Sequence, residues 1–170
     1  IARQQEHGDG HLIFKMNALV DPFCIAALCR ASQAGVHVDL QIRGICCLRP
    51  GLPGISENIR VTAIVGRFLE HARIYYFRNG GEEEVYLGSA DLMPRNLDRR
   101  VEILFPVQDP MLRKEILGTI LPVQLGDTAK SRCMQSDGTY TRIAPAPGDA
   151  PLNAHVWLIA HRGIWHDRHP

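Results

Sequence analysis

The stretch LIFKMNALVDPFCIAALCRASQAGVHVDLQI, residues 12–42, determines the fold class of this chain. Its first five residues, 12–16, are typical of a strand, and residues 36–42 alternate and are apolar enough for a second strand. Between them, Asp21 can cap a helix that has a proline in its first turn and ends at Gly35. Strand, helix and strand in this order predict a parallel βαβ unit with a right-handed crossover.

The rest of the chain continues the alternation of strands and helices. Asn79-Gly80-Gly81 is a strong hairpin signal between two strand candidates, and Asp109-Pro110 begins an amphipathic helix that reaches about Leu121. Asp137-Gly138 can form the turn of a small hairpin, residues 144–151 a linker or surface loop, and residues 152–162 a last helix. The further strands are expected at residues 59–65, 73–77, 84–89 and 100–107, with a short helical turn at 67–72.

Composition bounds the class of protein. The chain has 170 residues, of which 45 % are hydrophobic and 22 % charged, so one domain with a buried core is expected. The net charge of +1 argues against a general nucleic-acid or membrane-surface binder. Five cysteines without a CxxC pair or zinc spacing indicate a reducing compartment and no disulfide framework. Because the chain begins at Ile1 without a methionine, we expect it to be a piece of something longer.

Positive charge gathers in the middle of the chain. Residues 41–80 hold six arginines (43, 49, 60, 67, 73 and 78) against Glu57 and Glu70, an excess of four that could hold a polyanion or simply form a solvated face. Arg43 directly follows the second strand, and ligands of α/β sheets bind beyond the carboxyl ends of parallel strands. A loop arginine that caps carbonyl groups is the alternative for Arg43.

One histidine stands out within this region. His71 ends the apolar run 60–73, which also carries Arg60, Arg67 and Arg73, and Gly88-Ser89-Ala90-Asp91 follows downstream. Guanidinium groups bind phosphate oxygens and imidazole can act as nucleophile or acid/base, so the run suits a phosphate site. The alternative is a histidine packed at a helix end among solvated arginines.

The spacing of these residues resembles the phospholipase D superfamily. Its HxK motif and downstream Gly-Ser turn correspond to His71-x-Arg73 and Gly88-Ser89-Ala90-Asp91. In that superfamily the histidine is the nucleophile for phosphorus, and the basic residue and the turn hold phosphate oxygens. Arginine in place of lysine and aspartate in place of asparagine are departures that make ordinary phosphodiesterase chemistry doubtful, although Asp91 could orient Arg73 or His71 instead of meeting substrate.

Longer segments are closely similar to polyphosphate kinase. They are FKMNALVDP, IRGICCLRPGLPGISENIRV, AIVGRFLEHARIYYF and NGGEEEVYLGSADLMPRNLDRRVEILFPV, in this order, within residues 11–145. The resemblance implies an α/β fold of the phospholipase D type, a mixed sheet flanked by helices. It makes residues 1–170 a single C-terminal phospholipase D-like domain, the second of two, with a core at 11–145 and a tail at 146–170 that carries the terminal helix.

The resemblance also implies an activity and its residues. The family transfers the terminal phosphoryl group of ATP reversibly to polyphosphate, through a phosphohistidine on the preceding domain, which is absent from this chain together with the Mg²⁺ ligands. His71 corresponds to a second histidine across the active site, catalytic as a charge stabiliser or, less favourably, as a covalent carrier. Arg43 and His71 match ATP-binding positions. Secondary candidates for phosphate contact are Lys15, Asn17, Arg73 and Arg95, and ordinary surface or structural use is the alternative for each of them. No metal ligand is expected in this chain, including its tail, where His155, His161, His166 and His169 have no cysteine or carboxylate in register.

Two other classes of function stay open at this point. One is a single-motif phosphodiesterase of the phospholipase D type that completes its site as a dimer, and the other is a non-catalytic interaction module. For the favoured class, the expected partners are ATP, ADP, inorganic polyphosphate, the preceding domains and further copies of the full-length enzyme, with no nucleic acid. The expected location is the cytoplasm or the periphery of the inner membrane.

Overall fold

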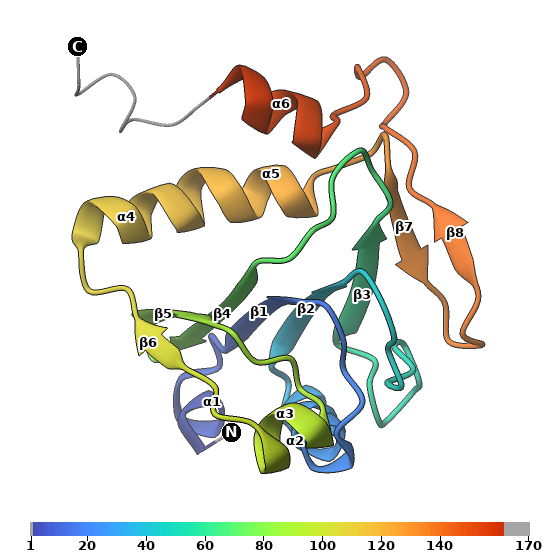
Figure 1. The fold of residues 1–170 in the computed structure, drawn as a ribbon. Coiled ribbons are helices and arrows are strands. Elements are labelled where there is room, and N and C mark those ends of the chain that lie inside the picture. The colour runs from blue at the N-terminus through green and yellow to red at the C-terminus, as the bar shows by residue number, and fades with distance from the viewer. Residues whose placement is uncertain (1, 162–170) are drawn as a thin grey trace.

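A mixed eight-stranded sheet runs through the part of the chain that the structure, a computed structural model, describes, residues 2–161 (Figure 1). Its strand order is β6-β5-β4-β1-β2-β3-β7-β8. The strands are β1 (His11–Met16), β2 (His37–Ile42), β3 (Ile59–Ile64), β4 (Arg73–Asn79), β5 (Glu82–Gly88), β6 (Leu104–Pro106), β7 (Ser131–Met134) and β8 (Tyr140–Arg142).

The centre of the sheet is parallel and its flanks are antiparallel. β1 pairs with β2 and β2 with β3 in parallel, whereas β4 runs antiparallel to β1 and β7 antiparallel to β3. The expected α/β fold with a mixed sheet is therefore confirmed. One edge consequently gathers the ends of β1, β2 and β3, the beginning of β4 and the end of β5, which we call the carboxyl edge.

Helices cover both faces of the sheet (Figure 1). A π-helical segment, Ile116–Ile120, joins α4 to α5 in one continuous rod, and α6 packs against α5. Pro122 in α5 has no backbone N–H that could donate a hydrogen bond, and the wider π-helical turn ends two residues before it, at Ile120. The α-helices are α1 (Ala2–His7), α2 (Pro22–Gln33), α3 (Pro94–Arg99), α4 (Pro110–Glu115), α5 (Leu121–Leu125) and α6 (Ala154–Ala160).

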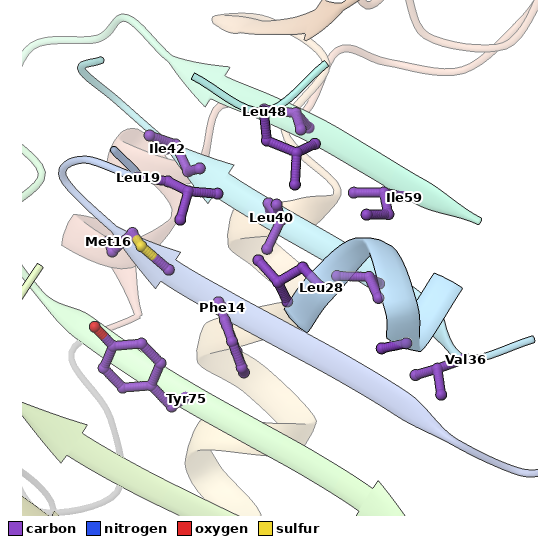
Figure 2. Packing of buried hydrophobic residues seen from close by; sticks show 13 residues of the cluster. Phe14, Met16, Leu19, Leu28, Val36, Leu40, Ile42, Leu48, Ile59 and Tyr75 are labelled. Carbon is purple, nitrogen blue, oxygen red and sulfur yellow. The ribbon is translucent and has the colours of Figure 1, made fainter. Parts of the chain in front are cut away.

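Because side chains alternate along each strand, the sheet contributes to two hydrophobic cores, one on each of its faces. Alternate residues of β1 point to opposite faces, so Phe14 packs with Leu28 of α2, whereas Ile13 packs with Ile116 and Leu121 of the rod. Figure 2 shows the first core, in which Leu28 reaches the side chains of β1 and β2. These two cores fix the order of layers, with α2 on one face of the sheet and the rod on the other.

Local signals in the sequence hold in the structure. The Asp21 side chain accepts a hydrogen bond from the Cys24 N–H at 2.8 Å, which is the predicted cap of α2. Gly80 and Gly81, with φ of 64° and 80°, form the predicted two-residue hairpin turn between β4 and β5. The strands expected at 12–16, 36–42 and 59–65, the β7–β8 hairpin and the helix at 152–162 are confirmed within a few residues.

Two local expectations are wrong. Residues 67–72 form no helical turn, because the Phe68 N–H and the Glu70 carboxylate bind partners in β1 and α6 instead of closing a turn. The strand expected at 100–107 is only Leu104–Pro106. Residues 100–103 are irregular and follow α3, which begins with Pro94 at its first position. The helical tail contributes α6, while His166 and His169 lie outside the described residues.

Two further observations concern the chain as a whole. All five cysteines are free thiols. Among residues 2–161, no helix combines the length and the apolar character that crossing a membrane requires.

Candidate functional site

Polar side chains meet at the carboxyl edge of the sheet. Asn17 directly follows β1, Arg43 directly follows β2, and Arg73 begins β4. Asp91 lies three residues beyond the end of β5, the antiparallel neighbour of β4. The topology thus brings together residues up to 74 positions apart in the sequence.

Arg73 and Asp91 form a buried, two-pronged ion pair. The Arg73 Nε donates to Asp91 Oδ1 at 3.2 Å and its Nη2 to Oδ2 at 3.0 Å. Their side chains are 12 % and 8 % exposed, so water screens the pair weakly. Burial by itself would raise the pKa of Asp91, but the hydrogen bonds from Arg73 and Asn17 outweigh it and the net pKa is lowered.

Asn17 links this pair to Arg43. Its backbone N–H donates to Asp91 Oδ1 at 2.7 Å, and its side-chain amide donates to Oδ2 at 3.2 Å. The Asn17 Oδ1 then accepts from the Arg43 Nε at 2.7 Å. Arg43 forms no ion pair with any carboxylate of the described residues, so its charge is oriented by a neutral amide and stays uncompensated.

His71 is exposed and touches Arg73. The His71 Nδ1 lies 2.8 Å from Arg73 Nη1, which also donates to the His71 carbonyl oxygen at 3.0 Å. Because a guanidinium only donates, Nδ1 is the acceptor and the neutral ring carries its proton on Nε2. The arrangement leaves an N–H donor on the outer side of the imidazole.

A second network lies behind the first. The Lys15 Nζ contacts Glu70 Oε2 at 2.6 Å, and the His155 Nε2 contacts Glu70 Oε1 at 2.5 Å. The Phe68 N–H donates to the His155 Nδ1 at 3.2 Å, so Nε2 is the protonated nitrogen that donates to Glu70. Burial would raise the pKa of Glu70, but hydrogen bonds from Lys15, Gln124 and His155 lower it below its ordinary value.

The structure brings most of the predicted phosphate residues together. Arg43, His71 and Arg73 belong to one hydrogen-bonded chain, and Asp91 orients Arg73, as one of the two readings of the sequence expected. Lys15 lies in β1, two residues before Asn17, but is buried and engaged by Glu70. Exposed Arg95, in α3, is not part of the chain of contacts.

The expectation that Arg60 shares a phosphate site with His71 is wrong. Arg60 lies near the beginning of β3, whereas His71 lies beyond its end, and each residue of a strand adds about 3.3 Å. The Arg60 Nη1 faces Asp39 at 4.0 Å instead. Arg67 lies over the Phe68 ring. The other arginines of the predicted excess are dispersed: Arg49 donates a hydrogen bond to the Ser136 carbonyl, and Arg78 lies beside Asp9.

The Gly-Ser turn has a structural use in this chain. The Ser89 hydroxyl donates to Glu102 and accepts from the Ile103 N–H at 3.1 Å. Glu102 also accepts from Asn96 at 2.5 Å. These contacts fasten the segment before β6 to the turn, so the Ser89 hydroxyl is already engaged.

Sequence reasoning missed the residues that support Glu70. His155 was considered only as a tail histidine, yet it is 4 % exposed and lies 85 positions from Glu70. Gln124 donates to Glu70 at 3.2 Å from the end of the rod. No local pattern could have indicated these pairings, because each joins segments that only the fold brings together.

The described residues of this edge do not fit Mg²⁺. Mg²⁺ prefers carboxylate and water oxygens in octahedral geometry. Both oxygens of Asp91 already accept from Arg73 and Asn17, and both oxygens of Glu70 accept from Lys15, His155 or Gln124. No free carboxylate among residues 2–161 therefore points into this chain of contacts.

A cavity of about 680 Å³ lies outside this chain of contacts, on the α2 face of the sheet. Its lining is mostly apolar and includes Leu12, Ala27 and Leu97 but none of Arg43, His71 and Arg73. We place the candidate site at the carboxyl edge because the groups predicted to bind phosphate converge there.

The chain is similar to known proteins over most of its length. The family model for the polyphosphate kinase C-terminal domain 2 matches residues 1–155. Polyphosphate kinase 1 of Chlorobaculum tepidum is 56 % identical over 151 residues, which are 89 % of this chain and 21 % of that protein. The polyphosphate kinase of Pseudomonas aeruginosa is 51 % identical over 149 residues, 88 % of this chain and 21 % of that protein.

A solved structure has the same fold. The crystal structure of polyphosphate kinase from Porphyromonas gingivalis superposes with a TM-score of 0.87 and 44 % identity, over 94 % of this chain and 25 % of that one. The chain thus spans about a fifth to a quarter of these relatives. From the family match, the relatives and the fold, we conclude that this chain belongs to the polyphosphate kinase C-terminal domain 2 family.

Proposed function

We propose that this chain supplies one half of a phosphoryl-transfer site in a polyphosphate kinase. The reaction is reversible transfer of the terminal phosphoryl group of ATP to polyphosphate, with release of ADP. Phosphoryl transfer depends mainly on positioning and on positive charge around the group in flight. The carboxyl edge offers both, through Arg43, Arg73 and His71.

The observation that carries the proposal is the uncompensated, oriented guanidinium of Arg43. Asn17 holds Arg43 Nε at 2.7 Å, and Asp91 holds Asn17 through two hydrogen bonds. Holding Nε in this way leaves the terminal nitrogens of the fork for the phosphate oxygens of a nucleotide. Because Arg43 forms no ion pair with a described carboxylate, phosphate meets no competing anion on that group.

His71 acts as a hydrogen-bond donor to charge on the transferred group. Its Nδ1 accepts a hydrogen bond from Arg73, so Nε2 carries the N–H that donates a hydrogen bond to a phosphate oxygen. A role as a second covalent carrier would need Nε2 unprotonated, and the Arg73 contact would then be lost with the change of tautomer. The geometry therefore favours stabilisation over covalent transfer.

Arg73 and Lys15 play supporting parts in this proposal. Arg73 orients His71 and offers residual positive charge beside Asp91. Lys15 is paired with Glu70 behind the edge, and the predicted direct contact with phosphate requires this ion pair to open.

The other components of the reaction belong to the rest of the enzyme. The phosphohistidine and the Mg²⁺ ligands are proposed to lie in the preceding domain, so this chain by itself is expected to bind ATP, ADP or polyphosphate weakly and to transfer nothing. Assembly into homo-oligomers and a cytoplasmic or peripheral inner-membrane location stay predictions for the full-length enzyme.

The test is a titration of the chain with ATP, ADP and short polyphosphate by calorimetry at two salt concentrations. Arg43→Ala and His71→Ala should each weaken binding by roughly 10–100-fold, the loss expected for a donor to a charged group. Arg30→Ala, an exposed arginine on α2, is the matched control and should change nothing. Binding that ignores both substitutions and only fades with salt would refute the assignment.

The phosphodiesterase alternative is not favoured. Ser89 is engaged by Glu102, and the Nε and Nη2 of Arg73 are engaged by Asp91, so two phosphate-holding elements of that superfamily already have partners. Hydrolysis of a phosphodiester by the isolated chain that His71→Ala abolishes would reverse this judgement.

A further inference from the structure

Three side chains of metal-ligand type meet at the edge of the sheet opposite to the candidate site. His11 begins β1 and His37 begins β2, and the two residues are direct partners in the parallel pairing. Asp39 lies two residues further along β2 and therefore on the same face as His37. The fold thus presents two imidazoles and one carboxylate side by side.

Their ligand atoms are close to the spacing that a metal ion requires. The Asp39 Oδ2 lies 2.9 Å from His11 Nε2 and 3.4 Å from His37 Nε2. One ligand atom from each of the three residues can be chosen so that all lie within 4.8 Å of one another. Ligand atoms that lie about 2.0–2.1 Å from a tetrahedral zinc ion are about 3.3–3.4 Å apart from one another. Only small movements of the two imidazole rings are therefore needed to reach this spacing.

The two oxygens of Asp39 are divided between two kinds of partner. Oδ1 faces the Arg60 Nη1 at 4.0 Å, and Oδ2 faces both histidines. Arg60 thereby orients the carboxylate to offer a single oxygen.

Access and chemistry favour a particular class of ion. The His37 side chain is 60 % exposed and the Asp39 side chain 11 %, so the cluster has a buried base and an open side where water can complete the coordination. Two imidazole nitrogens and one carboxylate oxygen suit zinc and neighbouring divalent transition ions, whereas Mg²⁺ prefers oxygen ligands alone.

We propose that His11, His37 and Asp39 form a binding site for one divalent transition-metal ion, with Zn²⁺ as the reference ion. The site is separate from the phosphate edge by the length of β1. Its ligands come from the first residues of two adjacent strands, so a bound ion would cross-link β1 to β2 and stabilise the folded chain.

The experiment is a titration with Zn²⁺ alone, by calorimetry, of a chain in which His161, His166 and His169 are replaced by alanine to remove tail histidines. We expect one ion per chain. His11→Ala and His37→Ala should each weaken binding by at least the roughly 10–100-fold that losing a group supporting a ligand costs. His7→Ala, a nearby exposed histidine outside the cluster, is the control and should leave binding unchanged.

Two further readouts separate binding at this cluster from loose association. Zn²⁺ at roughly 100 times its dissociation constant should raise Tm by about 5–10 °C, and His37→Ala, whose side chain is mostly exposed, should fold normally but lose this shift. Co²⁺ should give the visible absorption of a low-coordinate site in the parent chain and not in the variant. Absence of stoichiometric binding, or binding that survives both His11→Ala and His37→Ala, would overturn the proposal.

Discussion

Arg73 and Asp91 change together relative to the phospholipase D pattern, and their contact gives the physical reason. A guanidinium and a carboxylate match each other as flat, two-pronged partners, which an ammonium and an amide do not. The Asp91 carboxylate therefore accepts hydrogen bonds from Arg73 and Asn17 and orients both of them. A departure that looks adverse to phosphate binding in the sequence is a positioning device in the structure.

Asp91→Asn should lower the free energy of unfolding by about 3–5 kcal/mol, the cost of leaving a buried charge uncompensated. The Arg73 side chain is only 12 % exposed and cannot turn to water without moving the edge. Urea denaturation of the variant measures the loss. Glu82→Gln, which breaks the exposed pair with Arg3, is the control and should cost no more than about 1 kcal/mol. Equal effects of the two changes would contradict the role assigned to burial.

Gly66→Ala should also destabilise the chain, because the added methyl would lie 2.5 Å from the His155 Nδ1. His155 is held by Glu70 on one side and by the Phe68 N–H on the other, so its ring cannot move freely. We expect a loss of about 1–3 kcal/mol, typical of overpacking, in thermal or urea unfolding. A variant as stable as the parent would show that this loop is not fastened by His155.

At the scale of elements, the β4–β5 hairpin depends on its turn. Gly81 has φ of 80° and open space around its Cα, so alanine there suffers from backbone strain alone. Gly118 lies in the π-helical part of the rod, also with open space, where alanine gains helix propensity.

The same substitution should therefore have opposite signs at these two glycines. Gly81→Ala is expected to cost about 1–2 kcal/mol and Gly118→Ala to add about 0.5–1 kcal/mol to the free energy of unfolding. Both are measured by urea denaturation under one set of conditions. A loss at Gly118 would mean that the wide turn before Pro122 needs glycine.

At the scale of the whole molecule, stability should fall in acid. The net pKa values of Asp39, Glu70 and Asp91 lie below their ordinary values of 3.8, 4.5 and 3.8. The unfolded chain therefore binds more protons in this range, and the stabilisation is fully present above about pH 4.5 and is lost as the pH falls through the lowered values.

Urea denaturation between about pH 3 and pH 7 tests this dependence. The free energy of unfolding should decline below about pH 4.5, and Asp91→Asn together with Glu70→Gln should flatten the decline. A parent chain whose stability is constant or rises in acid would contradict the origin assigned to these shifts.

Residues close together in the chain were enough to predict the local elements. Asp21, the glycine pair at 80–81 and the alternation in 36–42 act through contacts within a few residues, so the cap of α2, the hairpin and the central strands were predictable. The motifs around Arg43 and His71 predict a phosphate site at a sheet edge, which stays a prediction, whereas the contiguous segments that resemble polyphosphate kinase identified the family.

The way in which these elements combine depends on contacts between distant parts of the chain. It placed Arg60 at the opposite edge beside Asp39, kept residues 67–72 out of a helix, and inserted His155 against Glu70. Each outcome depends on partners 21 to 87 positions apart, whose meeting is set by strand order and core packing. Local patterns carry no record of such partners, because their free energy exists only once the sheet and its two cores have formed.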